Sequence, residues 1–271
     1  VGADSLDDLM KKTVPEDILL KEKLKIGEPT SEHESLKQLK TIGEKNKVYT
    51  NYIGMGYSNT YMPNVIVRNI FCNPGWYTAY TPYQPEVAQG RLEMLLNYQQ
   101  MILDFTGMDI ANASLLDEAT AAAEAIGLSR RVDKNNLNKI FISSDCNPQT
   151  IDVIKTRTEV FNLQLIIGDQ QKDLKNIKDD IICGVLSYPG TLGDIRDPSE
   201  AISLIHKKKG KAILITDLLA LTKLKTPAEL GADIVVGNSQ RFGIPMGYGG
   251  PHAAFFATKE EYKRAMPGRI I

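Results

Sequence analysis

The sequence has few of the residues that build disulfide frameworks and metal sites. It holds 3 cysteines and 3 histidines in 271 residues. Cys72, Cys146 and Cys183 lie far apart without a Cys-x-x-Cys pair, and the histidines have no metal-ligand spacing to one another. The sequence therefore predicts no metal, no disulfide framework and three buried thiols that pack as small apolar groups.

An excess of charge of one sign and long apolar runs are also missing. Lys and Arg number 32 and Asp and Glu number 33, which gives a formal net charge of -1. This balance provides no electrostatic attraction to nucleic acid or anionic lipid. The longest apolar runs, such as residues 181–186, are far too short to cross a bilayer. We therefore expect neither a nucleic-acid partner nor a membrane span.

The two ends of the chain lack the features of natural termini. The first residues resemble neither a signal peptide nor an Arg-rich transit sequence, and no initiator methionine is present. Residues 268–271 carry no terminal feature either. We expect both ends to be cuts in a longer protein.

Helical patterns fill the chain up to about residue 107. The segment 31–34 predicts a helix start, because acids in a first turn favour the positive end of the helix dipole. The stretches 63–71 and 85–105 each begin at a proline, which is favoured at the first helical position. The second stretch presents one broad apolar face, and Gly107 is expected to end it.

After residue 110 short apolar runs alternate with helical stretches. Six runs are expected to be strands: 139–142, 165–167, 181–186, 212–215, 234–236 and 253–256. Helices are expected between them, at 119–128, 148–158 and 198–209. This alternation predicts the α/β class with a mostly parallel sheet covered on both faces. We divide the chain into an N-terminal helical arm, residues 1–60, and an α/β domain, residues 61–271.

Candidate ligand sites are sought at the carboxyl ends of the strands, where open α/β sheets bind their ligands. Asp217 closes one strand, and its carboxylate could pair with a protonated ring nitrogen or a metal. The alternative, that Asp217 caps the next segment, is favoured on spacing alone. The glycine-rich segment Asn238–Pro251 could receive an anion but fits no phosphate fingerprint, and Gly54–Asn59 fits no dinucleotide fingerprint.

A segment dense in tyrosine, Tyr77–Glu86, is stiffened by two prolines. Phenol rings combine an apolar body with a polar tip, so the segment suits a rigid aromatic wall beside a small ligand. A packed interface segment explains the same composition equally well. The residues alone leave both interpretations open.

Several long motifs, taken in order, resemble one known family. They are Tyr52–Tyr57, Tyr80–Arg91, Ala111–Ala125, Ser239–Gly243 and Pro251–Phe256. Together they are similar to the glycine decarboxylase P-protein of the glycine cleavage system, and the resemblance covers nearly the whole chain. The pattern Ser114–Glu118 is closer to the single-chain, homodimeric members than to members with a separate α subunit.

The resemblance implies a fold and an activity. The fold is that of the fold-type-I enzymes that use pyridoxal phosphate (PLP), with two such domains in tandem, of which only the C-terminal copy holds PLP. The family decarboxylates glycine and passes the aminomethyl group to the lipoyl arm of the H-protein. Implied partners are the C-terminal half, a homodimer partner, the H-protein and the substrate glycine. The implied location is the mitochondrial matrix, which we prefer, or the cytoplasm if the source is bacterial. The alternative is a non-catalytic α subunit of a two-chain enzyme.

This chain departs from the pattern of a PLP-binding copy, as a match to the N-terminal half requires. Gln240 stands at the position matched to the Schiff-base lysine, and a carboxamide cannot form an imine. Lys223 and Lys225 follow Asp217 too soon to replace it. Asn147 lacks the aromatic face of the expected ring-stacking histidine. The resemblance therefore implies no catalytic residue here and a vestigial cofactor site at Asp217, Asn147 and Gln240.

The resemblance also assigns residues to the pocket of the PLP-bearing half. These are Tyr57, Tyr80, Thr81, Pro82, Tyr83, Gln84, Ser114, Leu115, Leu116, Asp117 and Glu118. A small, dry pocket would reject amino acids larger than glycine. For any single tyrosine, interface packing is the competing interpretation. Without its tandem partner, the chain should expose apolar surface and associate or dissolve poorly.

Overall fold

The computed structural model describes residues 1–22, 24–247 and 252–271. They form two compact units, Val1–Thr50 and Asn51–Ile271. The predicted boundary between a helical arm and an α/β domain at residue 60 is a division into domains, which these compact units do not test, so it stays a prediction. In the described part of the chain, no helix is long and apolar enough to cross a membrane.

The first unit contains two capped helices, α1 (Leu6–Thr13) and α2 (Glu32–Gly43). The Ser5 side chain accepts the Asp8 N–H in the first turn of α1, and Ser31 and Glu34 form a reciprocal capping box on α2. The predicted start of α2 is thereby confirmed. Neither helix buries a residue, so these helices depend on their caps and first-turn acids rather than on packing.

The second unit opens with the helices that the two prolines predict. The first is α3 (Asn64–Ile66), which continues as the π-helix η1 (Val67–Phe71). The second is α4 (Pro85–Thr106), which ends at Gly107 in the left-handed conformation with φ 70°. The single broad apolar face predicted for α4 is only half correct. Its second half packs on the core, whereas Val87 in its first turn is 70% exposed.

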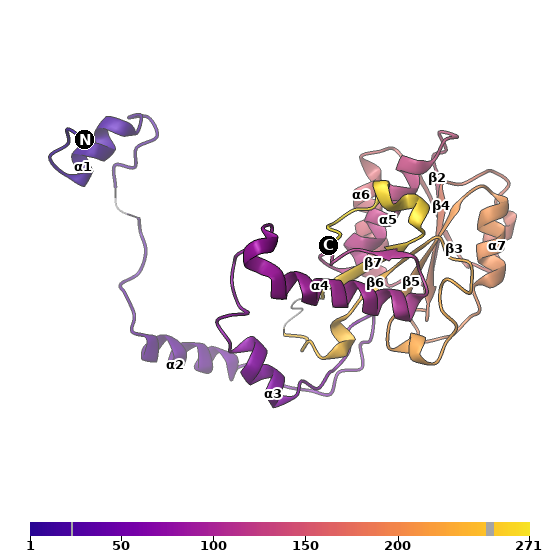
Figure 1. Cartoon of the computed structure of the whole chain (residues 1–271), viewed down its shortest axis with the longest axis horizontal. Helices are drawn as coiled ribbons and strands as arrows, with labels where there is room; N and C mark the ends of the chain where they lie inside the picture. The colour runs from indigo at the N-terminus through magenta and orange to yellow at the C-terminus, as the bar shows by residue number, and fades with distance from the viewer. Residues whose placement is uncertain (23, 248–251) are drawn as a thin grey trace. The chain divides into compact units, whose positions relative to one another are not determined.

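A seven-stranded sheet forms the centre of the second unit (Figure 1). In chain order the strands are β1 (Ile110–Ala111), β2 (Lys139–Ser143), β3 (Gln164–Gly168), β4 (Cys183–Tyr188), β5 (Lys211–Asp217), β6 (Ile234–Asn238) and β7 (Ala254–Thr258). In space the order is β1-β7-β6-β5-β4-β2-β3. The neighbouring strands β3, β2, β4, β5 and β6 are parallel to one another. The strand β7 runs antiparallel to β6, and β1 pairs antiparallel with β7, so β7 is the one reversed strand among the seven described strands. All six predicted strands are confirmed; β1 was missed because two residues make no apolar run.

Helices cover both faces of the sheet, which explains why its strands are apolar on both sides. The remaining helices are α5 (Glu118–Val132), α6 (Pro148–Glu159), α7 (Ser199–Lys207) and the 3-10 turns η2 (Leu174–Asn176), η3 (Ala220–Thr222), η4 (Gln240–Phe242) and η5 (Glu260–Ala265). One core cluster joins α5 and α6 to side chains such as Ile140 and Ile142. The other joins α4 and α7 to the opposite face, where Phe141 points. Cys146 and Cys183 are buried as predicted, but Cys72 is exposed, so that part of the prediction was wrong.

Strand register aligns the residues that end β5 and β6. Asp217 pairs with Asn238, and Thr216 pairs with Gly237. A Cβ on Gly237 would lie 2.2 Å from the Thr216 carbonyl oxygen, so only glycine fits there. This close approach brings the polar ends of β5 and β6 together at the carboxyl edge of the sheet.

The amino edge of the sheet is closed around one buried carboxylate. Asp233, just before β6, accepts from Lys259 Nζ at 2.5 Å and from the Ala212 N–H at 2.8 Å, and it lies 2.8 Å from His206 Nε2. Burial alone would raise the pKa of Asp233, but these partners outweigh it and hold the pKa below its ordinary value. His206 lies in the last turn of α7. The cluster ties α7, β5, β6 and β7 together.

Candidate functional site

A cavity of about 410 Å³ lies at the carboxyl ends of β4, β5 and β6. Its polar lining comes from those strand ends, from the start of α5, and from the segment Gly54–Ser58. The lining side chains with hydrogen-bonding groups are Tyr57, Ser58, Glu118, Asn147, Ser187, Thr191, Thr216, Asp217, Asn238, Gln240 and Arg241. A second cavity of about 410 Å³ shares Gly56, Tyr57, Glu118 and Asn238 with the first. A candidate ligand site therefore lies at the carboxyl ends of the strands, where the sequence analysis expected one.

Glu118 separates the two cavities and is held by neutral partners. Its Oε1 accepts from Asn147 Nδ2 at 3.1 Å and from the Thr150 hydroxyl at 3.4 Å, and its Oε2 accepts from Asn238 Nδ2 at 3.1 Å. Burial raises the pKa of Glu118 above its ordinary value, and these hydrogen bonds offset the rise only in part. Asn147, where a stacking histidine was expected, is therefore committed to a carboxyl group.

Asp217 uses both of its carboxylate oxygens within the protein. The Leu219 N–H donates to Oδ1 at 3.0 Å, and Arg241 Nε donates to Oδ2 at 2.8 Å. The first contact is the cap favoured from spacing. The second places a guanidinium where a protonated ring nitrogen would have to approach, so Asp217 does not fit the role of a ring partner.

Gln240 lies at the start of η4 with 1% of its surface exposed. Its Nε2 donates to the carbonyl oxygens of Ser58 at 2.8 Å and of Ile244 at 2.6 Å. Its Oε1 accepts from the Ser58 N–H at 3.3 Å. The side chain at the position matched to the PLP lysine is thus fully engaged with backbone groups. With Asn147 and Asp217 also committed, the residues present do not fit a covalently held PLP.

The segment Gly54–Ser58 forms one wall of both cavities. Gly54, Met55 and Gly56 all have positive φ, between 55° and 85°. Gln149 Nε2 donates to the Met55 carbonyl at 2.6 Å. A Cβ on Gly56 would lie 3.0 Å from Asn147 Nδ2, so this segment approaches the strand ends as closely as a glycine allows.

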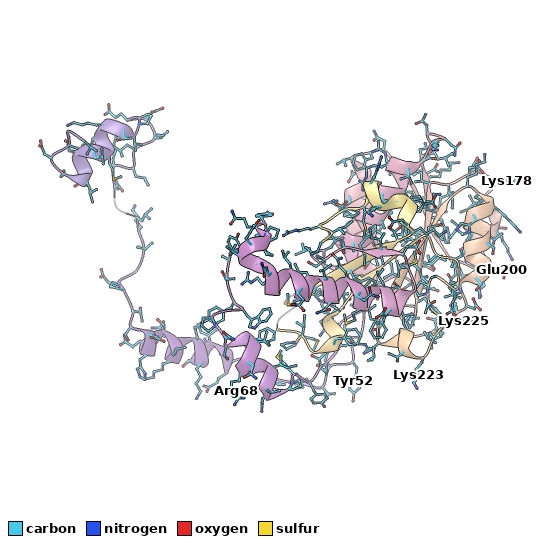
Figure 2. The ribbon with its side chains drawn as sticks, viewed as in Figure 1. Tyr52, Arg68, Lys178, Glu200, Lys223 and Lys225 are labelled. Carbon is cyan, nitrogen blue, oxygen red and sulfur yellow. The ribbon has the colours of Figure 1, made fainter. Side chains whose placement is uncertain are left out.

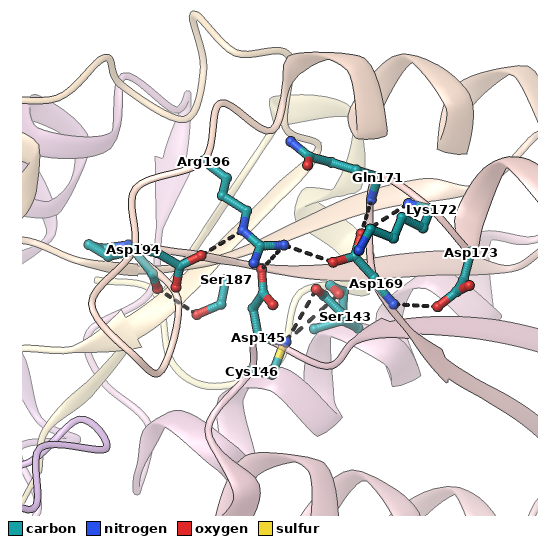
Figure 3. A network of polar contacts seen from close by, with 12 residues as sticks. Ser143, Asp145, Cys146, Asp169, Gln171, Lys172, Asp173, Ser187, Asp194 and Arg196 are labelled. Carbon is teal, nitrogen blue, oxygen red and sulfur yellow. Dashed lines mark hydrogen bonds and ion pairs between the residues drawn. The ribbon is translucent and has the colours of Figure 1, made fainter.

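An arginine holds the loop on the other side of the first cavity (Figure 3). Arg196 lies 2.6 Å from Asp194, 2.9 Å from Asp169 and 3.5 Å from Asp145. Burial raises the pKa of Asp145, and Arg196 partly offsets the rise. The Thr191 N–H donates to the Asp145 carbonyl at 2.7 Å. The network fixes the loop after β4 against the ends of β2 and β3.

The structure brings one group of the predicted pocket residues together. Tyr57, Leu116, Asp117 and Glu118 line the second cavity. Asp117 also caps α5 by accepting the Thr120 N–H at 2.7 Å. The other predicted residues, Ser114, Leu115, Tyr80, Thr81, Pro82, Tyr83 and Gln84, are not among the residues that line the two cavities in the described chain. Their assignment to a neighbouring pocket stays a prediction.

The tyrosine-rich segment lies at the surface of its unit. Tyr83 is 73% exposed, and the guanidinium of Arg269 stands 5.5 Å from its ring centre. Arg91 fixes the backbone by donating to the carbonyl oxygens of Tyr80 and Trp76. Tyr52, also exposed, is labelled in Figure 2. The backbone of the segment is therefore held by Arg91, while its tyrosine rings are exposed.

Lys223 and Lys225 are exposed on the stretch after η3 and line neither cavity (Figure 2). In the described residues, no group of three or more His, Cys, Asp or Glu side chains has an arrangement that could hold a metal ion. Of the glycine-rich segment, residues 248–251 lie outside the described residues.

Sequence reasoning gave no role to Arg241, Gln149 or His252. Arg241 follows β6 as Asp217 follows β5, and neighbouring parallel strands end at one edge, so this pair was within reach of the sequence. The His252 ring packs edge-on against Tyr57 with centroids 4.8 Å apart. Burial lowers the pKa of His252, which favours the neutral ring. No sequence pattern links Gln149 or His252 to the segment Gly54–Ser58.

Comparison with known proteins assigns the chain to a family. The family described as "Glycine cleavage system P-protein" matches residues 1–271. The chain belongs to this family. It is 72% identical over 271 residues to the glycine dehydrogenase (decarboxylating) of Pelagibacter ubique and 56% identical to that of Psychromonas ingrahamii. In each case it covers 100% of its own length and 28% of the relative.

Solved structures support the same family and fold. The crystal structure of glycine decarboxylase (P-protein) of the glycine cleavage system, in inhibitor-bound form, superposes with a TM-score of 0.90 and 34% identity. It aligns with 99% of this chain, which spans 61% of that one. A sphingosine-1-phosphate lyase from Burkholderia pseudomallei, at 11% identity and TM-score 0.66, shares the fold alone over 91% of this chain and 62% of its own. The predicted fold type I is confirmed.

Proposed function

We propose that this chain is the N-terminal part of a PLP-dependent glycine decarboxylase. The complete protein releases CO2 from glycine and passes the aminomethyl group to the lipoyl arm of the H-protein. Support comes from family membership over the whole chain and from relatives named glycine dehydrogenase (decarboxylating). Because the chain spans 28% of the length of those relatives, most of the machinery lies outside it.

In this proposal PLP is bound outside residues 1–271. The observation that carries this point is Gln240, which cannot form an imine and whose amide is closed in hydrogen bonds to Ser58 and Ile244. Asp217 is likewise paired with Arg241. Residues 1–271 therefore shape the substrate pocket, and the bond-breaking chemistry takes place in the PLP-bearing part of the protein.

The contribution of this part is a wall of the glycine pocket. Its rigid aromatic surface comprises Tyr57 and the segment Tyr80–Gln84, joined by Ser114–Glu118. The rings are exposed here and suit coverage by the remainder of the protein. A small, dry pocket built in this way holds glycine and excludes side chains larger than hydrogen. A homodimer partner and the H-protein complete the assembly.

A two-chain enzyme with this chain in a separate α subunit is the second candidate. The crystallised P-protein chain favours it, because this chain spans 61% of that shorter chain. The higher identity to the longer relatives, 72% against 34%, favours a single chain. We prefer the single chain, and the reading frame downstream of Ile271 decides between the two.

The relatives named above are bacterial, which argues against the preferred mitochondrial location. We therefore place the protein in a bacterial cytoplasm, the alternative given by the sequence. Fractionation of the source cells tests this placement.

The activity is tested with carboxyl-labelled glycine, PLP and lipoylated H-protein. We expect the full-length protein to release labelled CO2 and residues 1–271 alone to release none. Borohydride treatment followed by peptide mass spectrometry should place fixed PLP on a lysine outside residues 1–271. A stoichiometric PLP adduct on a lysine within 1–271 would contradict the proposed division of labour.

A further inference from the structure

Gln240 makes a two-way contact with the wall of the cavities. Its amide nitrogen donates to the Ser58 and Ile244 carbonyl oxygens, and its amide oxygen accepts from the Ser58 N–H. Gln240 and Ser58 are 182 positions apart in the chain. A single buried side chain therefore joins the loop after β6 to the segment Gly54–Ser58.

The two-way contact requires a carboxamide. A lysine at position 240 could donate to both carbonyls but could not accept the Ser58 N–H, because an ammonium group has no acceptor. A methionine fills the same length and makes neither bond. Since burying a backbone N–H without a partner is costly, glutamine suits this place in a way that lysine does not.

Two further contacts lie beside this one, from Gln149 in α6 and from Thr60, which follows the segment. Gln149 Nε2 binds the Met55 carbonyl, and the Thr60 hydroxyl binds the Ile244 carbonyl at 2.9 Å. A Cβ on Gly56 would lie 3.0 Å from Asn147 Nδ2, so Asn147 is in close contact with this segment while its amide binds Glu118. Position 147 belongs to the predicted vestigial cofactor site, as position 240 does.

The supported loop carries Tyr57, which lines both cavities and packs on His252. Three consecutive positive φ angles precede it, so this backbone needs outside contacts to stay in one conformation. Tyr57 is also the one aromatic side chain of the proposed glycine-pocket wall that lies beside these cavities. Tyr57 directly precedes Ser58, whose N–H and carbonyl Gln240 binds.

We propose that Gln240 is a positioning residue for the glycine pocket: its carboxamide fixes Gly54–Ser58 and thereby orients Tyr57 toward the PLP-bearing part. This inference rests on the proposed function and deepens it. It assigns an active role to the residue that replaced the cofactor lysine. Gln240 touches no reacting atom, so its effect is on substrate placement.

The test uses the full-length holoenzyme with the variants Gln240→Met and Gln240→Lys. The matched control is Gln170→Met, because Gln170 is also 1% exposed and, in the described residues, makes no hydrogen bond to Gly54–Ser58. Glycine KM and kcat, PLP content and hydrogen exchange of peptides covering residues 54–58 are measured for each protein. Gln240→Lys keeps both donor contacts, so it carries the test if Gln240→Met does not fold.

We expect both variants to speed exchange at residues 54–58 and to raise glycine KM about tenfold, with kcat lowered less than about threefold. PLP content and its absorbance stay at the wild-type level, and Gln170→Met changes none of these. In a double-mutant cycle, Gln240→Met adds little to Tyr57→Ala, because both act on the same side chain.

Faster exchange with unchanged glycine kinetics, or full additivity in the cycle, overturns the role given to Gln240 while leaving the proposed function intact. A wild-type protein that binds no PLP and shows no glycine-dependent CO2 release overturns the proposed function itself, and the positioning role with it. The wild-type measurement therefore separates the two failures.

Discussion

Two carboxyl groups at opposite edges of one sheet, the buried Asp233 and the partly buried Glu118, have opposite kinds of partner. Asp233, at the amino edge, is bound by a lysine, a histidine and a backbone N–H, and its pKa lies below the ordinary value. Glu118, at the carboxyl edge, is bound by two amides and a hydroxyl, and its pKa lies above the ordinary value.

The difference separates a structural edge from a functional one. A buried carboxylate with a cationic partner stays ionised and fixes the elements around it. A partly buried carboxyl group with neutral partners can take up a proton, and Glu118 faces two cavities. The first arrangement stabilises the fold, whereas the second keeps a titratable group at the place where ligands bind in this class.

Loss of the amino-edge cluster should have the largest effect. Asp233→Ala leaves the buried Ala212 N–H without its partner and removes the acceptor of Lys259, and we expect a loss of about 1–3 kcal/mol in the free energy of unfolding. Because the folded-state pKa of Asp233 is lowered, its contribution is present above the unfolded pKa and is lost as pH falls through the folded pKa. Urea denaturation at neutral and acid pH measures both. Asp152→Ala, which removes an exposed ion pair, is the control and should change little.

Loss of Arg196 should open the carboxyl edge locally. In Arg196→Ala, three carboxylates face one another without a cation, so the loop of residues 189–196 should become a protease site. The effect should shrink as pH falls, because protonated carboxyl groups no longer repel. Limited proteolysis with mass spectrometry detects the cut, and Arg68→Ala is the exposed control (Figure 2). An uncut loop in the variant would show that the network does not hold it.

Neutralising Glu118 should have a smaller effect, of the opposite sign to Asp233. The raised folded-state pKa means that its contribution is present below the unfolded pKa and is lost as pH rises through the folded pKa. Glu118→Gln should therefore remove this loss of stability with rising pH, because the amide does not titrate. Glu124→Gln, in the same helix, is the matched control. Parallel curves for wild type and Glu118→Gln would remove the contrast between the two edges.

Surface changes on α4 should affect folding least and association most. Val87 and Leu96 are 70% and 48% exposed and belong to the apolar surface that the isolated chain leaves uncovered. We expect residues 1–271 to associate as concentration rises, and Val87→Lys with Leu96→Lys to reduce association without moving the urea midpoint. Sedimentation velocity measures this. A sharp monomer at high concentration for the unchanged chain would contradict the prediction.

Most of the fold could be predicted from the sequence because its helices and strands correspond to local patterns of apolar residues and prolines. Apolar runs gave the six longer strands, and the prolines at 63 and 85 gave two helix starts. The face of α4 was half wrong because periodicity reports which side is apolar, not whether anything covers it. The strand β1 was too short to leave a pattern.

The site was predictable only where the strand-end rule applies. Asp217 was found because it ends a strand, and its cap was favoured from spacing. The cluster around Glu118 draws on residues up to 120 positions away, and its contacts depend on the order of strands in the sheet. Periodicity does not fix that order. The resemblance singled out Gln240 because a carboxamide cannot form an imine. Its hydrogen bonds to Ser58 could be seen only in the structure.

The hydrogen bonds of Gln240 also limit what a single substitution can do at this edge. A lysine at position 240 would set a cation against the Ser58 N–H donor, beside an Asp217 that already pairs with Arg241. Building a covalent cofactor site here would therefore demand coordinated changes at several positions.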